Sequence, residues 1–133
     1  MTLTFTTPGT CVPQGSMRGF VVNGQARVTH AKPLALTEWR RAIAASATDA
    51  GAVCEDGACI VSLVFNLARG KTVRRAYPTV KPDIDKLARS VLDALTGVCW
   101  QDDAQVCDLI LSKRYSDTPG LTVTVSRLRE EKC

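Results

Sequence analysis

The chain has 133 residues, of which 45% are hydrophobic, and a formal net charge of +4. We expect one domain over residues 1–133, because a chain of this size can bury a sizeable core without dividing it. No segment approaches the roughly 18 consecutive apolar residues of a membrane span, and the start lacks the basic head and apolar run of a secretory signal. We therefore expect a cytoplasmic protein with no membrane partner.

The six cysteines contain no C-x-x-C pair, and His30 is the only histidine. This pattern argues against a structural zinc site and against a Ser-His-Asp catalytic arrangement. Most of the cysteines lie among apolar neighbours, so we expect reduced thiols that behave as small buried hydrophobic side chains.

The first half of the chain predicts a strand, a hairpin and a helix. The run LTFTT alternates apolar residues with threonines, as a half-buried strand does, and a loop rich in glycine and proline follows. The Asn-Gly pair in VVNGQARV favours a hairpin turn. Thr37 is a suitable N-cap for a helix that runs to about Ala50 and stops at Gly51, with Trp39 and Ile43 facing inward.

The second half predicts a strand, a helix and two more strands. Every odd position from 59 to 67 is apolar, which indicates a strand. Apolar residues from Ile84 to Leu95 recur at helical spacing, and Gly97 stands where a left-handed C-terminal cap belongs. Further strands are expected over 104–115 and in GLTVTVS. The order of elements indicates an α+β fold, with helices packed on one face of a mixed or mainly antiparallel sheet.

Four aspartates flank the second predicted helix, and each of them alone has an ordinary explanation. Asp83 could cap the helix N-terminus, and Asp85 could pair with Arg89 four positions later. Asp102 and Asp103 lie in a turn, where aspartates are common because they hydrogen-bond the local backbone.

Taken together, the same acids suggest a metal site. Three or more converging carboxylates repel one another, and a hard divalent cation such as Mg²⁺ or Mn²⁺ is the natural compensation. Fifteen residues of helix would separate Asp83 from Asp102 by roughly 20 Å at about 1.5 Å per residue. The two acid pairs therefore meet only if the chain after the helix folds back, or if a second subunit completes the site.

A basic stretch leads directly into the first acid pair. Positions 69–81 hold several cations and no acid. Such a run is consistent with a solvated loop or with a surface that binds a polyanion. The candidate DNA-binding residues are Lys71, Arg74, Arg75, Lys81 and Lys86, with Gln14, Ser16 and Arg18 of the N-terminal loop as weaker candidates.

The run KPDIDKLARSVLDALTGVCWQDDAQVCDLILSKRY closely resembles the signature of RusA-type Holliday junction resolvases. It has a D-x-D at a helix start, then DALTG, a Trp, D-D-A-Q-V and a strand that ends in Lys-Arg. The N-terminal GTCVPQGSMRGF is similar to the phage-borne branch of the family.

This resemblance implies a RusA-like fold and a Mg²⁺-dependent endodeoxyribonuclease of DNA recombination and repair, with Mn²⁺ as a substitute metal. It assigns Asp83, Asp85 and Asp103 as the essential carboxylates and Asp102 as a further metal ligand. It also implies a homodimer that resolves four-way junctions by paired symmetric nicks, since two sites related by a twofold axis can cut two symmetry-related strands.

Two positions depart from the family pattern. The family usually has asparagine directly after the second aspartate and a catalytically important lysine four residues after it, where this chain has Lys86 and Arg89. Arginine keeps the charge but does not reproduce a compact ammonium that exchanges protons. Arg89 is the first candidate for the catalytic cation and Lys86 the second. The alternative function is a catalytically impaired protein that binds branched DNA without cutting it.

Overall fold

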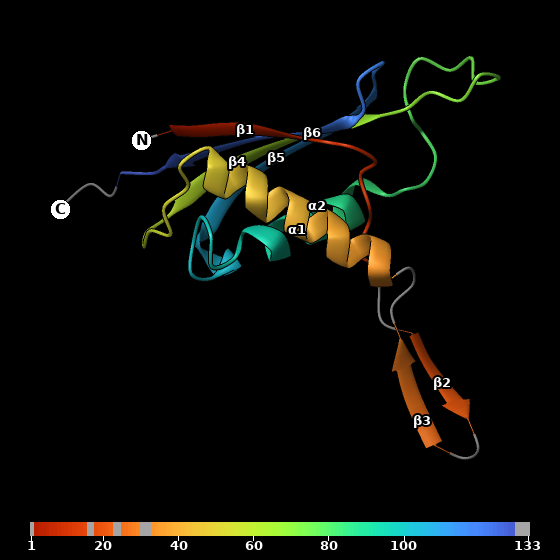
Figure 1. Ribbon diagram of the computed structural model, residues 1–133, viewed down its shortest axis with the longest axis horizontal. Coiled ribbons are helices and arrows are strands. Elements are labelled where there is room, and N and C mark those ends of the chain that lie inside the picture. The colour runs from red at the N-terminus through yellow and green to blue at the C-terminus, as the bar shows by residue number, and fades with distance from the viewer. Residues whose placement is uncertain (1, 16–17, 23–24, 30–32, 130–133) are drawn as a thin grey trace.

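The computed structural model describes residues 2–15, 18–22, 25–29 and 33–129. Its main sheet has four strands in the order β1-β6-β4-β5 (Figure 1). The β1–β6 and β6–β4 pairs are antiparallel, whereas β4 and β5 run parallel, so the sheet is mixed. The strands are β1 (Thr2–Pro8), β4 (Cys59–Leu67), β5 (Val106–Tyr115) and β6 (Gly120–Arg127).

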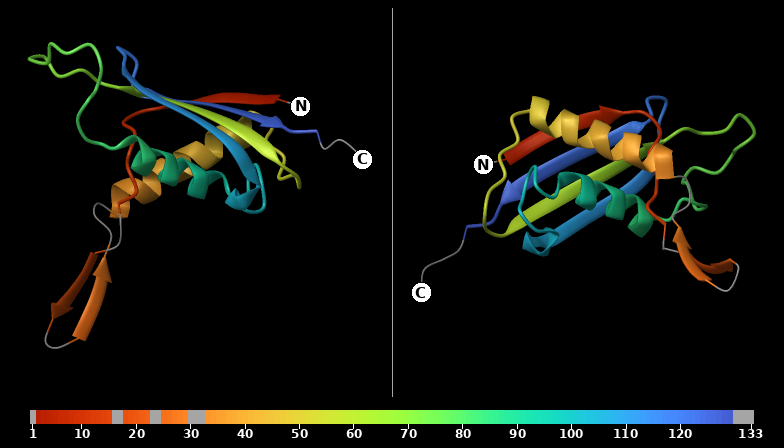
Figure 2. Two further views of the ribbon diagram at one scale, coloured as in Figure 1. Left: turned by 180° about the vertical axis from the view of Figure 1, so that it is seen from behind. Right: turned by 60° about the horizontal axis from the view of Figure 1, so that its bottom comes forward.

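Two helices, α1 (Pro33–Asp49) and α2 (Ile84–Leu95), lie side by side on one face of this sheet (Figure 2). Strands β2 (Arg18–Val22) and β3 (Gln25–Thr29) form a separate antiparallel hairpin outside these two layers. The expected α+β fold, with helices on one face of a mixed sheet, is confirmed.

The core lies between the helices and the covered face of the sheet. Val61, Leu63 and Phe65 of β4 are fully buried, and they alternate with side chains on the open face. Helix α2 presents Leu87 and Val91 to the same core. Burying side chains of this size stabilises the fold by about 1.5–3 kcal/mol each, so the apolar arc of α2 fixes how the helix sits on the sheet.

Helix α1 begins earlier than the sequence suggested. It starts at Pro33. Proline fits the first helical position, because the N–H that it lacks would have no hydrogen-bond acceptor within the helix there. Thr37 therefore lies inside the helix, and its expected role as N-cap is wrong. Trp39 and Ile43 are buried as expected, and Gly51 follows the helix with φ +93°.

The loop over residues 68–83 carries the chain from the end of β4 to the start of α2. Helix α2 then runs back along the sheet, so that β5 can start beside the start of β4 and run parallel to it. A short helix, η1 (Asp103–Gln105), precedes β5, which begins at Val106 rather than at 104. No helix within the described residues is long and apolar enough to cross a membrane.

Candidate active site

Asp83 occupies the N-cap position of α2, with an extended backbone at φ −68° and ψ 141°. Its side chain makes no capping hydrogen bond, so the interpretation of Asp83 as a helix cap is wrong. The carboxylate is exposed, and Lys86 Nζ lies 3.7 Å from its Oδ2. Such an exposed pair contributes little to stability, which leaves the carboxylate available to a ligand.

Asp85 lies in the first turn of α2 and is also exposed. Within the described ranges it forms no ion pair, so the expected pairing with Arg89 is absent. Asp83 and Asp85 therefore present two solvent-facing carboxylates at the positive end of the helix dipole, where negative charge is stabilised.

Lys113, near the end of β5, fixes the segment that leads into Asp83. Its Nζ donates hydrogen bonds to the carbonyl oxygens of Val80 at 2.7 Å and Pro82 at 2.9 Å. The helix N-terminus is thereby tied to the sheet through a side chain outside the acid pair.

The basic loop is anchored to the same end of the sheet. The guanidinium carbon of Arg69 lies 4.9 Å from the centre of the Tyr115 ring, and that of Arg75 lies 5.9 Å from it. Cation–π contacts of this kind attract the loop toward the end of β5. Lys71, Arg74 and Lys81 remain exposed, so their charges face solvent, and Lys81 lines a hollow together with Asp83.

Two hollows lie next to these charges. One of about 470 Å³ is lined by Asp83, Lys81 and Lys86. The other, of about 270 Å³, shares Lys81 and is lined by Arg75 and Tyr115 as well. The surface around the start of α2 is therefore concave, and the charged side chains that line the two hollows are three cations and one carboxylate.

The far end of α2 uses its aspartates differently. Asp102 Oδ1 accepts a hydrogen bond from the Ala104 N–H at 2.9 Å, and Gln105 Oε1 accepts one from the Asp102 N–H at 3.0 Å. This capping box confirms the structural interpretation of Asp102. Asp103 is exposed, and its side chain has no hydrogen bond or ion pair with another described residue.

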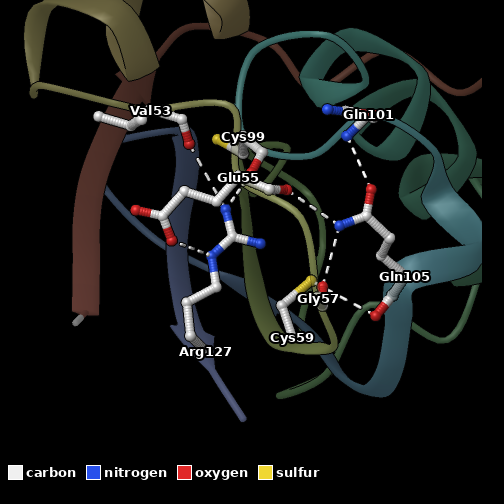
Figure 3. A network of polar contacts seen from close by, with 8 residues as sticks. All are labelled: Val53, Glu55, Gly57, Cys59, Cys99, Gln101, Gln105 and Arg127. Atoms are coloured by element: carbon white, nitrogen blue, oxygen red, sulfur yellow. Dashed lines mark hydrogen bonds and ion pairs between the residues drawn. The ribbon is translucent and has the colours of Figure 1, made fainter. Parts of the chain in front are cut away.

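A polar network holds this end together (Figure 3). Gln105 Nε2 donates to the carbonyl oxygens of Glu55 at 3.0 Å and Gly57 at 2.9 Å. Arg127 Nε lies 3.0 Å from Glu55 Oε2, and its Nη2 donates to the Cys99 carbonyl. These contacts join η1, the loop before β4 and the end of β6 into one support for Asp103.

The two acid pairs do not meet within one protomer. They flank α2, whose 12 residues span about 18 Å at about 1.5 Å per residue. The chain after α2 does not fold back, because η1 leads into β5 at the end of the sheet away from Asp83. Across the described residues, no group of three or more His, Cys, Asp or Glu could hold a metal ion. Completion of the site by a second subunit stays a prediction.

The sequence profile of the family described as Endodeoxyribonuclease RusA matches residues 8–126. The chain belongs to the RusA endodeoxyribonuclease family. It is also similar to the "Uncharacterized protein YqaN" of Bacillus subtilis (strain 168), with 46% identity over 48 residues. That similarity covers 36% of this chain and 34% of the relative, so it spans about a third of either protein.

The two positions where this RusA family member departs from the expected pattern lie close to the acid pair. Lys86 carries the ammonium nearest to Asp83 Oδ2, at 3.7 Å, whereas Arg89 is exposed one turn further along α2. Both stay candidates for the catalytic cation, and Lys86 is the nearer one.

Gln14 has a structural contact that the sequence did not suggest. Its Nε2 donates to Asp93 Oδ2 at 2.6 Å, and its backbone N–H donates to the Lys86 carbonyl at 2.9 Å. Gln14 therefore ties the N-terminal loop to α2, and this contact uses one of the two N–H groups of its side-chain amide. Ser16 and His30 lie outside the described residues, as does the turn of the predicted hairpin.

The cysteines of the described ranges are unpaired, as expected. Burial raises the pKa of both Cys11 and Cys99 to about 11, and it also raises the pKa of Cys59. These thiols are therefore poor nucleophiles near neutral pH. Cys54 and Cys107 are exposed.

Proposed function

We propose that this RusA family member is a metal-dependent endonuclease that selects four-way DNA junctions and nicks two symmetry-related strands. The observation that carries the proposal is the family match over residues 8–126, a range that includes both acid pairs. The exposed carboxylates of Asp83, Asp85 and Asp103 support it, because the fold does not use them for its own hydrogen bonds.

The proposed metal is Mg²⁺, with Mn²⁺ as a substitute, since carboxylate oxygens prefer hard divalent cations. Asp83 and Asp85 of one protomer would provide two ligands, and Asp103 of the partner subunit would provide the third. Asp102 of the partner subunit is a weaker candidate, because one of its carboxylate oxygens already accepts the Ala104 N–H. When bound, such an ion polarises a phosphoryl oxygen and lowers the pKa of a bound water.

The protein's cations have a separate role in the proposal. Lys86 lies beside Asp83, and Arg89 follows one turn later on α2. A cation at either position would stabilise negative charge that develops on the phosphate during cleavage. The nearer position of Lys86 favours it over Arg89 for this role.

The loop over residues 68–83 would bind the DNA backbone. Lys71, Arg74 and Lys81 are exposed, and Arg75 is oriented by its contact with Tyr115. Contacts of this type read phosphates rather than bases, so the preference for a junction would come from the shape of the DNA and not from its sequence.

A homodimer follows from two requirements of the proposal. Each metal site needs acids from both ends of α2, and a single protomer holds those ends apart. Cutting two symmetry-related strands also needs two active sites related by a twofold axis. A twofold-symmetric dimer in which each active site takes aspartates from both chains meets both requirements.

The test is cleavage of a synthetic four-way junction in the presence of Mg²⁺, with a linear duplex of matched sequence as the control substrate. We expect paired symmetric nicks in the junction alone, and a loss of roughly 10³-fold in rate for Asp85→Asn, because a charge that holds the metal is removed. Equal cleavage of the linear duplex would contradict the junction assignment. Tight junction binding without scission in Mg²⁺ or Mn²⁺ would instead support the catalytically impaired alternative.

A further inference from the structure

We propose that β5 is the strand through which two copies of this chain associate, paired antiparallel about a twofold axis close to Ile110. The strand is 10 residues long and forms one edge of the main sheet. Its outer side pairs with no other described strand. The role that we assign to this interface rests on the proposed function: it would bring together the aspartates that each active site needs from two chains.

The middle of β5 exposes apolar side chains. Leu109 is 40% exposed and Ile110 is 60% exposed. The opposite edge of the sheet, β1, exposes threonines instead and ends at Pro8. Natural proteins keep an edge polar or interrupt it when it has no partner, and a long apolar edge is usually covered. The contrast indicates that β5, and not β1, is the covered edge.

Symmetry limits how two copies of β5 can pair. A twofold axis perpendicular to the sheet keeps each face of the sheet on its own side, so side chains from the same face must oppose each other. The β4–β5 register puts Asp108, Ile110, Ser112 and Arg114 on the open face. The residue nearest the axis must therefore oppose the same residue of the partner subunit. An axis midway between two consecutive residues would oppose side chains from different faces, which this symmetry excludes.

An axis beside Ile110 also brings opposite charges together. Asp108 would then oppose Ser112 of the partner subunit, with Arg114 of the partner subunit as its diagonal neighbour. Diagonal neighbours lie about 7–8 Å apart, within reach of a long side chain such as arginine. The strand is acidic before its midpoint and basic after it, which favours antiparallel pairing over parallel pairing.

The same antiparallel pairing places opposite ends of the two β5 strands side by side. The start of β5, which follows Asp103, would lie beside the end of β5 in the other copy. That end is where Lys113 holds residues 80 and 82, directly before Asp83. Acids that α2 keeps apart in one protomer would therefore approach each other across the axis.

The mass of the protein in solution tests this interface. Sedimentation equilibrium with Mg²⁺ should give twice the chain mass of 14.3 kDa for the wild type and the chain mass for Ile110→Asp, in which two like charges would oppose each other at the axis. Leu34→Asp is the matched control, since Leu34 is 70% exposed on α1 and away from β5, and it should stay dimeric. A dimeric Ile110→Asp or a monomeric wild type would overturn the proposal.

A cross-link provides a second readout that does not require the charged variant to fold. Opposed residues at the axis have Cα atoms about 4.5–5.5 Å apart, which a disulfide can bridge. Ile110→Cys, made in a chain with Cys54, Cys107 and Cys133 replaced by serine, should form a covalent dimer on mild oxidation. Leu34→Cys in the same background should not. Failure of Ile110→Cys to cross-link more than Leu34→Cys would contradict the pairing.

These measurements need no nuclease activity, so the interface and the nuclease activity can fail separately. A monomeric wild type would contradict both, because the proposed function also requires a homodimer. A dimer through β5 that cuts no DNA in any metal would contradict the proposed function and leave the interface intact. A protein that cuts junctions while Ile110→Asp stays dimeric would contradict the interface and leave the proposed function intact.

Discussion

The two ends of helix α2 use the same residue type for different purposes. Asp83 sits at an N-cap position without making a capping hydrogen bond, whereas Asp102 sits at the N-cap of η1 and completes a capping box with Gln105. At the first end the backbone is held by Lys113, and at the second it is held by the acid itself. The comparison shows that an aspartate is available to a ligand where another side chain does the structural work.

This difference also separates the neighbours Asp102 and Asp103. Asp102 accepts the Ala104 N–H, while the Asp103 side chain contacts none of the described residues through a hydrogen bond or ion pair. Adjacent aspartates that are both exposed thus have unequal structural roles. Substitutions at the four acids should reveal this asymmetry.

The largest effect should separate Asp103 from Asp102 in catalysis. Asp103→Asn should lower the rate of junction cleavage by roughly 10³-fold, because it removes a proposed metal ligand. Asp102→Asn should lower it by about tenfold or less, since asparagine can still accept the Ala104 N–H as a cap. Single-turnover cleavage with excess enzyme measures both rates. Equal losses in the two variants would contradict the distinction.

A smaller effect is expected when the support of Asp83 is removed. Lys113→Met takes away the two hydrogen bonds to residues 80 and 82 and should lower the cleavage rate by about tenfold, because misplaced catalytic groups react slowly. The Mg²⁺ concentration for half-maximal rate should rise in parallel. Arg41→Met, on the exposed side of α1, is the control and should leave both quantities unchanged. An unchanged cleavage rate and Mg²⁺ dependence in Lys113→Met would contradict this supporting role.

In stability, unlike catalysis, Asp102 should matter more than Asp83. Asp102→Ala should lower the free energy of unfolding by about 1 kcal/mol, the usual cost of a lost N-cap. Asp83→Ala should change it by less than about 0.5 kcal/mol, because no capping hydrogen bond is lost and an exposed ion pair such as the one with Lys86 contributes little. Urea unfolding at one fixed protein concentration compares them. A larger loss for Asp83→Ala would mean that its side chain does cap α2 in solution.

The smallest effect concerns the basic loop. Arg74→Gln should reduce the slope of log affinity for a junction against log salt by about one, as expected for one phosphate contact, and Arg41→Gln should not. Metal binding should be unaffected. An unchanged slope would show that Arg74 does not contact the backbone of the DNA.

Much of the fold could be predicted from local patterns. The alternation in β4 and the helical spacing in α2 identified both elements at close to their true bounds, because each buries one face against the core. The sequence pattern did not identify Pro33 as the start of α1, because Thr37 is a residue type that favours the N-cap position and therefore suggested a later start. The start of β5 moved because the capping box of Asp102 winds the next residues into η1.

The candidate site could be predicted in composition but not in arrangement. The ordered acids carry the family signature, and the length of α2 already implied that Asp83 and Asp102 lie far apart. Lys113 was missed because its role depends on the parallel register that brings it to residues 80 and 82. The D-x-x-Q spacing of Asp102 and Gln105 is a capping-box signature that could have identified the capping aspartate. Spacing does not show that the Asp83 side chain makes no capping hydrogen bond, because that depends on its orientation.

The most direct test of the account is to mix two inactive variants. Asp83→Asn and Asp103→Asn chains are purified separately, allowed to exchange subunits, and assayed for nicking of a four-way junction in Mg²⁺. If each site takes its acids from two chains, a mixed dimer keeps one intact site, and random exchange should restore about a quarter of the wild-type sites. If all the acids of a site come from one chain, the mixture will be as inactive as either variant alone, and the composite site will be contradicted.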